Sequence, residues 1–429
     1  MSTATPLTAP GPSIAGTPET AQRVLRLLER LPRGQLDLQP PSGPVRRLGA
    51  EGESASHRSG AWNPAEPLRA RLVLHDWRAL ERAWRSGDIG LAEGFIAGEW
   101  STPDLPALLR LCIVNRDHLE DLVYGRWWGR LAHRLRHLMR RNSRAGSARN
   151  IHAHYDLGND FYRLWLDPGM SYSAAWFEGR DARGADLAAA QDAKMRRALR
   201  EARVSAGDRL LEIGCGWGGL AELAAREFGA GVTGVTLSRE QLAWGQARIR
   251  SAGLQDRVEL RYQDYRDLPA RHAAEPFDAI VSIEMFEAVG HEYWRGYFDT
   301  LRTCLKPGGR ACIQTITIRD DLFERYRRST DFIQQYVFPG GLLPSIPAFE
   351  REARRAGFVV EQRLAFGPDY AETLRRWRAA FLARAQALPG LGFDQRFERI
   401  WLFYLAYCEA AFDTGNTDVV QFTLRKSDA

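Results

Sequence analysis

From residue 208 to residue 318, segments typical of buried strands alternate with segments typical of helices, and this alternation constrains the fold most strongly. The first strand-like segment, "DRLLEIGCGWGG" (208–219), runs into a glycine-rich turn, and a helical pattern follows it. Four further strand-like segments cover 230–238, 257–265, 277–286 and 308–318. Strands that alternate with helices form parallel, doubly wound sheets, which bind ligands at the carboxyl ends of their strands. The sequence therefore predicts an α/β fold with a mainly parallel sheet.

The rest of the chain divides by composition. Residues 1–20 lack the basic start and apolar core of a signal peptide and are expected to form a disordered leader. Residues 21–118 mix short strand-like and helical segments, which indicates a small α+β domain. A basic amphipathic helix and a linker are expected at 119–150, and the main domain at 151–429. Its last part, 320–429, is expected to be mostly helical.

The segment 119–141, "LEDLVYGRWWGRLAHRLRHLMRR", combines arginines with apolar residues at helical spacing. The whole chain has a net charge of +6 and a pI near 9.2, which favours an anionic partner. A helix of this kind can lie on an anionic membrane surface, contact RNA, or connect two domains with a solvated charged face. We expect the membrane surface and no nucleic acid, because the apolar residues form one stripe.

The five cysteines are scattered without the paired spacing of a zinc site or a disulfide framework. No metal is expected, and a reducing cytoplasm is the compartment that this pattern favours. No apolar run reaches the roughly 18 to 20 residues that a membrane span needs. Together with the basic segment, this predicts a cytoplasmic protein that associates peripherally with the inner face of the cell membrane.

The glycine-rich turn "EIGCGWGG" places Gly214, Gly216 and Gly218 directly after the first strand, with the acidic Glu212 before them. Glycines at this position let the backbone turn tightly and approach a ligand closely. Nicotinamide-binding domains have a related pattern and are the main alternative. The spacing and the preceding acid resemble the S-adenosylmethionine (SAM) methyltransferases instead.

Two later strand ends agree with a SAM site in their order along the chain. Thr236 and Gln241, at the end of the second strand and the start of its helix, are candidates for hydrogen bonds to the ribose and the amino-acid part of SAM. Asp264 and Tyr265 follow the third strand, where the adenine is expected. SAM is therefore the predicted cofactor.

Several longer motifs resemble the cyclopropane-fatty-acyl-phospholipid synthase family, to which the mycolic acid cyclopropane synthases and methyltransferases are related. The resemblance implies a Rossmann-like class I SAM methyltransferase domain preceded by a smaller α+β domain. It also implies methyl transfer from SAM to a cis double bond in the acyl chain of an unsaturated phospholipid. The motifs are "HYDLGNDFYRLWLDPGMSYSAAWF" (154–177), "EIGCGWGGLA", "GVTLSREQ", "YRDL", "MFEAVG", "DFIQQYVFPGGLLPS" (331–345) and "FGPDYAETLRRW" (366–377).

The resemblance also implies roles for individual residues. Tyr172 and Ser173 would hold the methionine carboxylate of SAM, and Ile283 would pack on the adenosine. The family binds a bicarbonate ion, and Glu287, Tyr370 and the backbone amide of Ile316 match three of its contacts.

Two other bicarbonate contacts of the family differ in this sequence. Ala174 stands where the family has cysteine, and Gln314 where it has histidine. An amide can donate a hydrogen bond to bicarbonate but cannot accept a proton as imidazole can. These departures indicate a rebuilt site.

Methyl transfer to an alkene leaves a carbocation, which must be kept from water and then lose a proton. The aromatic candidates for shielding the cation are Tyr265, Phe286, Tyr336, Phe338 and Tyr370. Glu287 is the predicted base or bicarbonate holder, whereas Glu284, three residues earlier, is expected to contact the cofactor. A cyclopropane is the predicted product. A methylene- or methyl-branched chain and an RNA methyltransferase activity stay open as alternatives, as does a homodimer.

Overall fold

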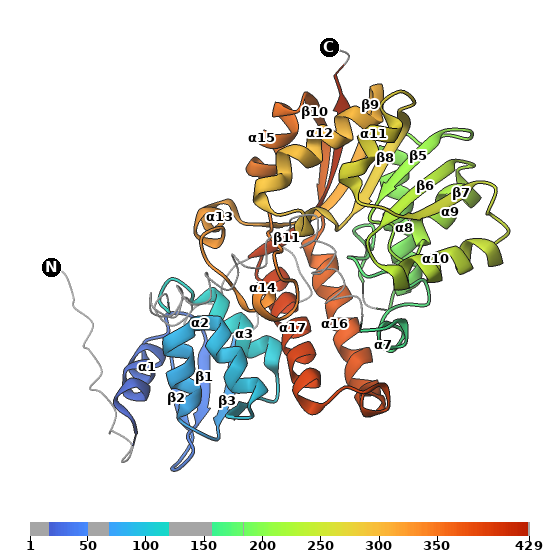
Figure 1. Cartoon of the computed structure of the whole chain (residues 1–429). Coiled ribbons are helices and arrows are strands. Elements are labelled where there is room, and N and C mark those ends of the chain that lie inside the picture. Colours follow the sequence, from blue (N-terminus) through green and yellow to red (C-terminus); the bar gives the residue numbers. More distant parts are fainter. Residues whose placement is uncertain (1–16, 50–67, 120–156, 183, 428–429) are drawn as a thin grey trace. The chain divides into compact units, whose positions relative to one another are not determined.

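The computed structural model describes residues 17–49, 68–119, 157–182 and 184–427. The first two ranges belong to one compact unit and the last two to another (Figure 1). Of the predicted leader, residues 1–16 lie outside the described residues. Of the predicted basic helix and linker at 119–150, only Leu119 is described, so the membrane-binding prediction falls on residues without a description.

The smaller N-terminal unit combines helices with a four-stranded sheet of order β2-β1-β3-β4. β1 and β3 are parallel, and the other two pairs are antiparallel. Alternate residues of β3 are buried, as expected for a strand with one face on a core. The strands are β1 (Gln35–Gln39), β2 (Arg46–Leu48), β3 (Arg69–Leu74) and β4 (Trp100–Ser101), and the helices are α1 (Glu19–Glu29), α2 (Arg78–Ile96) and α3 (Leu105–Val114).

The larger unit is built on a seven-stranded sheet of order β10-β11-β9-β8-β5-β6-β7. The five strands predicted from the alternating pattern are all present and mutually parallel. They are β5 (Arg209–Ile213), β6 (Gly231–Thr236), β7 (Val258–Tyr262), β8 (Phe277–Ile283) and β9 (Leu305–Ile318). The predicted α/β fold with a mainly parallel sheet is confirmed.

Two strands of this sheet were not expected. β11 (Thr417–Lys426) pairs antiparallel with β9, and β10 (Phe358–Ala365) pairs antiparallel with β11. Both lie within 320–429, which the sequence pattern had indicated as mostly helical. Through β11 the C-terminal segment pairs with β9, and the start of β11 lies opposite the carboxyl end of β9.

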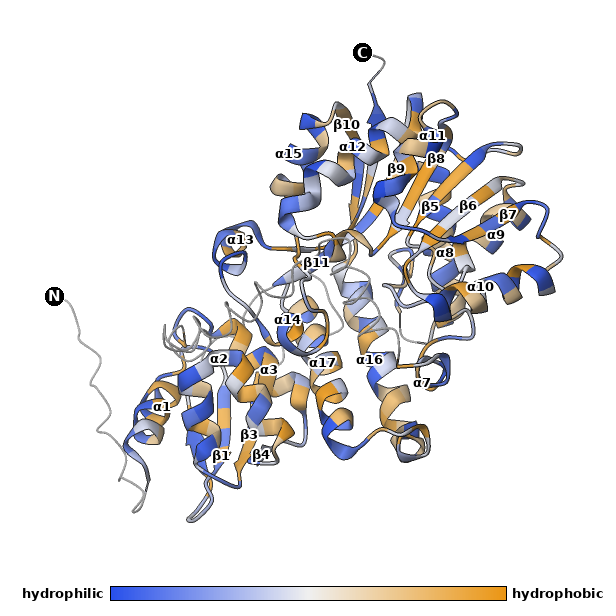
Figure 2. Cartoon of the chain, viewed as in Figure 1, coloured by the Kyte–Doolittle hydropathy of each residue, from blue (hydrophilic) through white to orange (hydrophobic). Residues whose placement is uncertain are grey.

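Helices cover both faces of the seven-stranded sheet. Leu210 and Leu211 are neighbours in β5 but belong to two different core clusters, because successive side chains of a strand point to opposite faces. Figure 2 shows β5 and β8 as mainly hydrophobic, whereas α10 carries hydrophilic residues on its outer side. The helices are α7 (Asn159–Arg163), α8 (Leu187–Glu201), α9 (Gly219–Glu227), α10 (Arg239–Ser251), α11 (Leu268–His272), α12 (Trp294–Cys304), α13 (Asp320–Tyr326), α14 (Phe332–Tyr336), α15 (Ile346–Arg355), α16 (Gly367–Arg384) and α17 (Gln395–Asp413).

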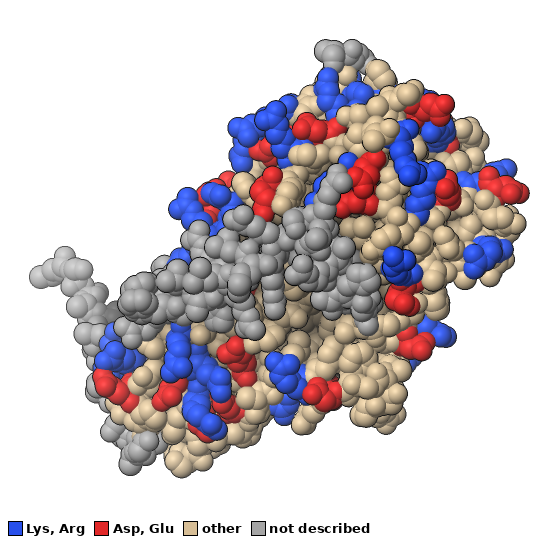
Figure 3. Space-filling model, in the orientation of Figure 1, with Lys and Arg blue, Asp and Glu red and all other residues tan. Residues whose placement is uncertain are grey.

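Basic and acidic side chains are interspersed over the described surface that Figure 3 shows. Many of them form ion pairs, such as Arg196 with Glu227 at 2.7 Å and Arg310 with Glu361 at 2.7 Å. Among the described helices, none has the length and the apolar character needed to cross a bilayer.

Candidate active site

A pocket lies at the carboxyl ends of β5, β6 and β8, where a parallel sheet is expected to bind its ligand. The structure brings most of the predicted cofactor residues together around it. Those that line the pocket are Tyr172, Ser173, Gly214, Gly216, Thr236, Gln241, Tyr265 and Ile283. Gly218 and Asp264 are not among the described residues that line it.

The glycine-rich turn explains why Gly214 and Gly218 differ in role. Gly214 has a φ of 84°, and a Cβ there would lie 2.9 Å from the Met285 side chain, so any larger residue would disturb the pocket wall. Gly218 has a φ of 81° and precedes α9. A Cβ there would lie 3.3 Å from Gly245 of α10. Gly218 therefore permits two helices to pack, and Gly214 permits close approach to the pocket.

The loop that carries Tyr172 and Ser173 is fixed by two polar contacts at Gly169. The Asp167 carboxylate accepts the N–H of Gly169 at 2.7 Å. Arg248 of α10 donates to the carbonyl oxygen of Gly169, also at 2.7 Å. These contacts hold the loop over the glycine-rich turn, so its two predicted residues line the same pocket.

The ends of β6 and β7 supply further polar groups. The Thr236 hydroxyl donates to Oε1 of Gln241 at 3.0 Å, which holds both side chains at the pocket wall. Asp264 instead forms an ion pair with Arg266 at 2.5 Å. Of the two residues expected near the adenine, Tyr265 lines the pocket and Asp264 is not among the described residues that do so.

Two buried polar atoms at the pocket have no partner in the part of the chain that the structure describes. They are Oε2 of Glu212 and Nε2 of Gln263, and both residues line the pocket. Burial raises the pKa of Glu212 to about 8, against the opposing effect of Arg248. The Glu212 oxygen, at the end of β5, can accept a hydrogen bond from a hydroxyl or ammonium group of a ligand. The Gln263 amide, after β7, can donate one to a heteroaromatic ring. The residues present therefore fit SAM.

Glu284, the residue after β8, lies at the inner wall of this pocket and receives three hydrogen bonds. The N–H of Ala174 donates to its carboxylate at 2.9 Å, Nε2 of Gln314 at 2.7 Å, and the Tyr370 hydroxyl at 2.7 Å. The structure thus brings Tyr370 and Gln314 to Glu284, whereas the sequence had placed them with Glu287. The expectation that Glu284 contacts the cofactor agrees with its place in the pocket.

Glu287 lies in the 3₁₀ turn Phe286–Ala288 and is not among the described residues that line the pocket. Its Oε1 accepts the N–H of Ile316 at 2.5 Å, so two of the residues expected to contact bicarbonate are bonded to each other. Its Oε2 is buried and has no partner among the described residues. Burial, together with the charge of Glu284, raises the pKa of Glu287 to about 8. Glu287 is therefore neutral at pH 7.

Lys194, which lies on α8 at the pocket wall, was not among the residues expected at the site. Its Nζ donates to the Ser173 hydroxyl at 2.5 Å, and burial lowers its pKa to about 8 although Glu284 favours the charged form. Gln191, Lys194 and Arg197 recur every three residues on the buried side of the helix. Polar residues at core spacing were the signal that could have revealed it.

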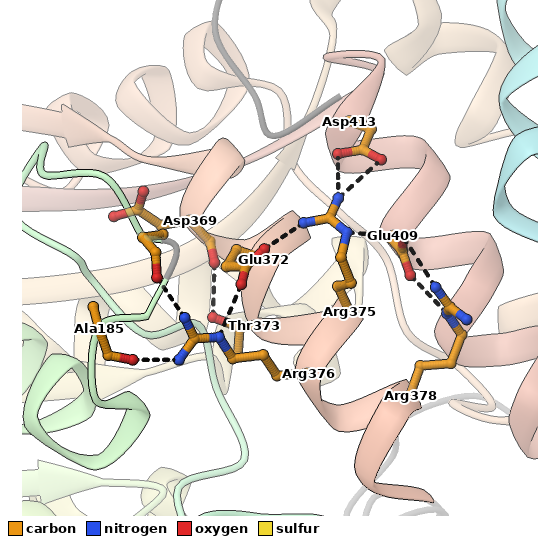
Figure 4. Close-up of polar contacts among 10 residues, drawn as sticks. Ala185, Asp369, Glu372, Thr373, Arg375, Arg376, Arg378, Glu409 and Asp413 are labelled. Atoms are coloured by element: carbon orange, nitrogen blue, oxygen red, sulfur yellow. Dashed lines mark hydrogen bonds and ion pairs between the residues drawn. The ribbon is translucent and has the colours of Figure 1, made fainter. Parts of the chain in front are cut away.

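Helix α16, which carries Tyr370, is held against α17 by buried ion pairs (Figure 4). Arg375 donates to Asp413 at 3.1 Å, and Arg378 donates to Glu409 at 2.7 Å. Both carboxylates are almost completely buried. Such pairs contribute little net stability against apolar substitutes, but the loss of one partner is costly. They fix the position of α16.

The same helix also holds the loop that supplies the backbone donor to Glu284. The Thr373 hydroxyl accepts the N–H of Ala175 at 3.1 Å. Arg376 donates to the carbonyl oxygen of Ala185 at 2.6 Å, as Figure 4 shows. The phenol donor and the backbone donor that meet at Glu284 are therefore positioned by one helix.

Aromatic side chains pack between Tyr172 and Tyr370. Their rings lie 5.5 Å and 6.1 Å, respectively, from the ring of Trp377. Phe338 stacks on Tyr172 at 6.4 Å. Phe286, which was also expected to shield a cation, is instead fully buried in the core against α12 and α15. The aromatic cluster thus borders the pocket near Glu284 and includes Tyr370 and Phe338 of the predicted set.

Known proteins match this chain over the region that builds the site. The family model of the mycolic acid cyclopropane synthetases matches residues 142–422. A tuberculostearic acid methyltransferase of Mycobacterium tuberculosis is 40% identical over 370 residues, which are 85% of this chain and 85% of that protein. The cyclopropane-fatty-acyl-phospholipid synthase of Escherichia coli K12 is 34% identical over 84% of this chain and 88% of that protein.

A solved structure agrees with these matches. The mycolic acid cyclopropane synthase complexed with SAH and CTAB has a TM-score of 0.60 and 34% identity, covering 65% of this chain and 98% of that one. The family and the cofactor class predicted from the motifs are confirmed. This chain belongs to the mycolic acid cyclopropane synthetase family and is a SAM-dependent methyltransferase.

Proposed function

We propose that this enzyme transfers the methyl group of SAM to a cis double bond in the acyl chain of an unsaturated phospholipid. The observation that carries the proposal is the position of Glu284. Its carboxylate lies at the wall of the SAM pocket and is bonded to Tyr370, whose ring belongs to the aromatic cluster. A methyl donor, a proton acceptor and an apolar aromatic wall are the three parts that methylation of an alkene needs.

When bound, SAM supplies a methyl group on a positively charged sulfur. The π electrons of the substrate's double bond form the new C–C bond, and the electron pair of the broken S–C bond stays on sulfur. A positive charge then develops on the neighbouring carbon of the acyl chain. The rings of Tyr172, Trp377 and Tyr370 exclude water from this carbon and stabilise the charge through their π faces.

The product that we propose first is a cyclopropane, formed when the proton leaves the newly added methyl group and a third C–C bond closes. The similarity to the Escherichia coli synthase supports it. A second candidate is an open chain with a methylene branch. It forms when a hydrogen first moves with its electron pair from the methylated carbon to the cationic carbon, so that the proton then lost from the methyl group leaves its electron pair as a double bond. Two observations favour this candidate: the relative with 40% identity is named a methyltransferase, and the contacts at positions 174 and 314 differ from the family pattern.

We also propose that the enzyme works at an anionic membrane surface on the cytoplasmic side. The support is the arginine- and tryptophan-rich sequence of 119–141 and the location of acyl chains inside a bilayer. Vesicle sedimentation tests this part. Binding should strengthen with the fraction of anionic lipid and weaken with salt, and equal binding to neutral vesicles would contradict it.

The function is tested by incubation of the protein with SAM and vesicles of an unsaturated phospholipid, followed by mass spectrometry of the released fatty acids. The expected product has gained one CH₂ unit. Resistance to mild hydrogenation identifies the cyclopropane, and uptake of hydrogen identifies the methylene branch. Methylated RNA without any methylated acyl chain would contradict the proposal.

A further inference from the structure

The donors around Glu284 do not fit the bicarbonate ion that the family resemblance implies. Tyr370 matches one bicarbonate contact, and Gln314 stands at the position of another, but both side chains donate to Glu284, each at 2.7 Å. The N–H of Ala174 donates to the same carboxylate at 2.9 Å. A second anion at these donors would lie directly against a like charge. The carboxylate therefore occupies the place where the ion is expected.

We propose that the carboxylate of Glu284 is a built-in substitute for this ion and accepts the proton that leaves after methyl transfer. The inference rests on the proposed methylation of an acyl chain and names the base of that reaction. Glu287, the base expected from the sequence, is bonded to the backbone of Ile316 and lies outside the set of described pocket residues.

The backbone of Glu284 has a conformation that is unfavourable for a residue other than glycine. Its φ is 49°, in the left-handed region that glycine adopts readily and other residues adopt rarely. Such strain persists only where surrounding contacts maintain it. Here the Glu284 N–H also donates to the carbonyl oxygen of Gln314 at 2.8 Å, so both backbone and side chain are tied to β9. A glycine would relieve the strain but would supply no carboxylate.

The groups around Glu284 suit a buried proton acceptor. Burial raises the pKa of Glu284, and the charge of Lys194 and the hydrogen bonds from Tyr370, Ala174 and Gln314 oppose this rise. Glu287 is neutral at pH 7 and adds no second negative charge. The result is a carboxylate of increased basicity, held in place by three donors, as general-base catalysis requires.

The proposed step balances without another reactant. A C–H bond of the transferred methyl group breaks, and its electron pair closes the ring on the cationic carbon. For the methylene branch, a hydride shift first moves the positive charge to the methylated carbon, and the same C–H electron pair then forms the double bond. The proton moves to an oxygen of Glu284. Release of that proton to water after the product leaves restores the carboxylate.

The test uses Glu284→Gly, which removes the carboxylate, relieves the positive φ and frees the three donors. In buffer depleted of carbon dioxide, the wild type should keep its full turnover on unsaturated phospholipid vesicles. The variant should bind SAM normally and lose about 10²-fold or more of the turnover. Added bicarbonate or formate should restore part of the lost turnover in the variant and leave the wild type unchanged.

A second measurement does not depend on turnover. Calorimetric titration should detect formate binding to Glu284→Gly and not to the wild type. Glu284→Gln serves as the matched control, because it removes the charge while the glutamine side chain still occupies the space next to the three donors. It should lose turnover, bind no formate and show no recovery, and it keeps the test valid if the glycine variant fails to fold.

Three results would overturn the inference. The wild type could lose turnover when bicarbonate is removed, Glu284→Gly could stay active without an added ion, or it could fail to bind or to respond to either ion. Each of these leaves the acyl-chain methylation of the wild type intact. A wild type that methylates no acyl chain under any condition would instead contradict the proposed function.

Discussion

The side-chain amide of Gln421 donates to Oε1 of Gln314 at 2.9 Å, and Nε2 of Gln314 donates to Glu284 at 2.7 Å. The two glutamines are opposite each other in the pairing of β9 with β11, and both are 0% exposed. Arg197 donates to Oε1 of Gln421 at 2.5 Å, which fixes the orientation of that amide. Because the carbonyl of Gln314 is engaged by Gln421, its NH₂ group must face Glu284.

Gln421→Leu should therefore lower kcat by roughly 10- to 100-fold through a misplaced Gln314, with little change in the dissociation constant of SAM. It should also cost about 1–3 kcal/mol of stability, because a buried carbonyl loses its donor. Thr423→Val is the matched control, since it removes one hydrogen bond to Glu201 two residues along the same strand. This control should keep kcat, and equal losses of kcat in both variants would contradict the positioning role.

Lys194→Met should shift the acid limb of the kcat–pH profile to higher pH. The positive charge of Lys194 lowers the pKa of Glu284, so its removal raises that pKa, and more alkaline conditions are needed to keep the carboxylate charged. The pKa of Lys194 itself is about 8, so the wild type also loses this charge above that pH. The two profiles should converge there. An unchanged acid limb, with Lys306→Met as an exposed control, would show that Lys194 does not act on Glu284.

Glu287→Gln should be more stable than the wild type, and the difference should grow with pH. In the folded wild type the pKa of Glu287 is about 8 instead of 4.5, so folding takes up a proton between these values and becomes less favourable as the pH rises. The neutral amide avoids this loss. Denaturant unfolding of both proteins from pH 5 to pH 9 should show a gap that widens up to about pH 8 and then levels off.

The same variant should keep its turnover at neutral pH, because glutamine resembles the protonated form of Glu287. A loss of most of the turnover at pH 7 would instead favour Glu287 as the base. A stability gap that does not change with pH would show that Glu287 is charged in the folded protein.

Gly214→Ala should weaken SAM binding by at least about tenfold, because its Cβ would lie 2.9 Å from Met285 at the pocket wall. Gly207→Ala has nearly the same φ of 85°, but its Cβ meets nothing within 4 Å. It therefore carries the same backbone strain without the contact at the pocket. Calorimetry should show weaker SAM binding only for the first variant, and equal effects would assign the loss to strain alone.

The central part of the sheet could be predicted because its strands and helices alternate locally along the chain. β11 was missed because its partner β9 lies about a hundred residues earlier, and such distant pairing decides strand formation more than local propensity does. β10 was missed for a similar reason. Its exposed polar residues Glu361, Gln362 and Arg363 do not alternate in a way that indicates a strand.

The pocket residues could be predicted from motifs at the strand ends, since those motifs occur in a fixed order. The hydrogen bonds of Tyr370 and Gln314 to Glu284 could not be predicted, because they depend on how the chain leaves β8. A positive φ at Glu284 directs that carboxylate to the donors, and a glutamate gives no sequence signal of such a backbone. Lys194 was missed because one buried lysine in an arginine-rich helix looks like a surface residue.

The most direct test of the account uses SAM whose transferred methyl group carries three deuterium atoms, with unsaturated phospholipid vesicles as the acceptor. Mass spectrometry of the released acyl chains should find two of the three deuterium atoms in the chain, because the third leaves as the ion that Glu284 accepts. Acyl chains without deuterium, with the label in a lipid headgroup or in RNA, would contradict methylation of the double bond.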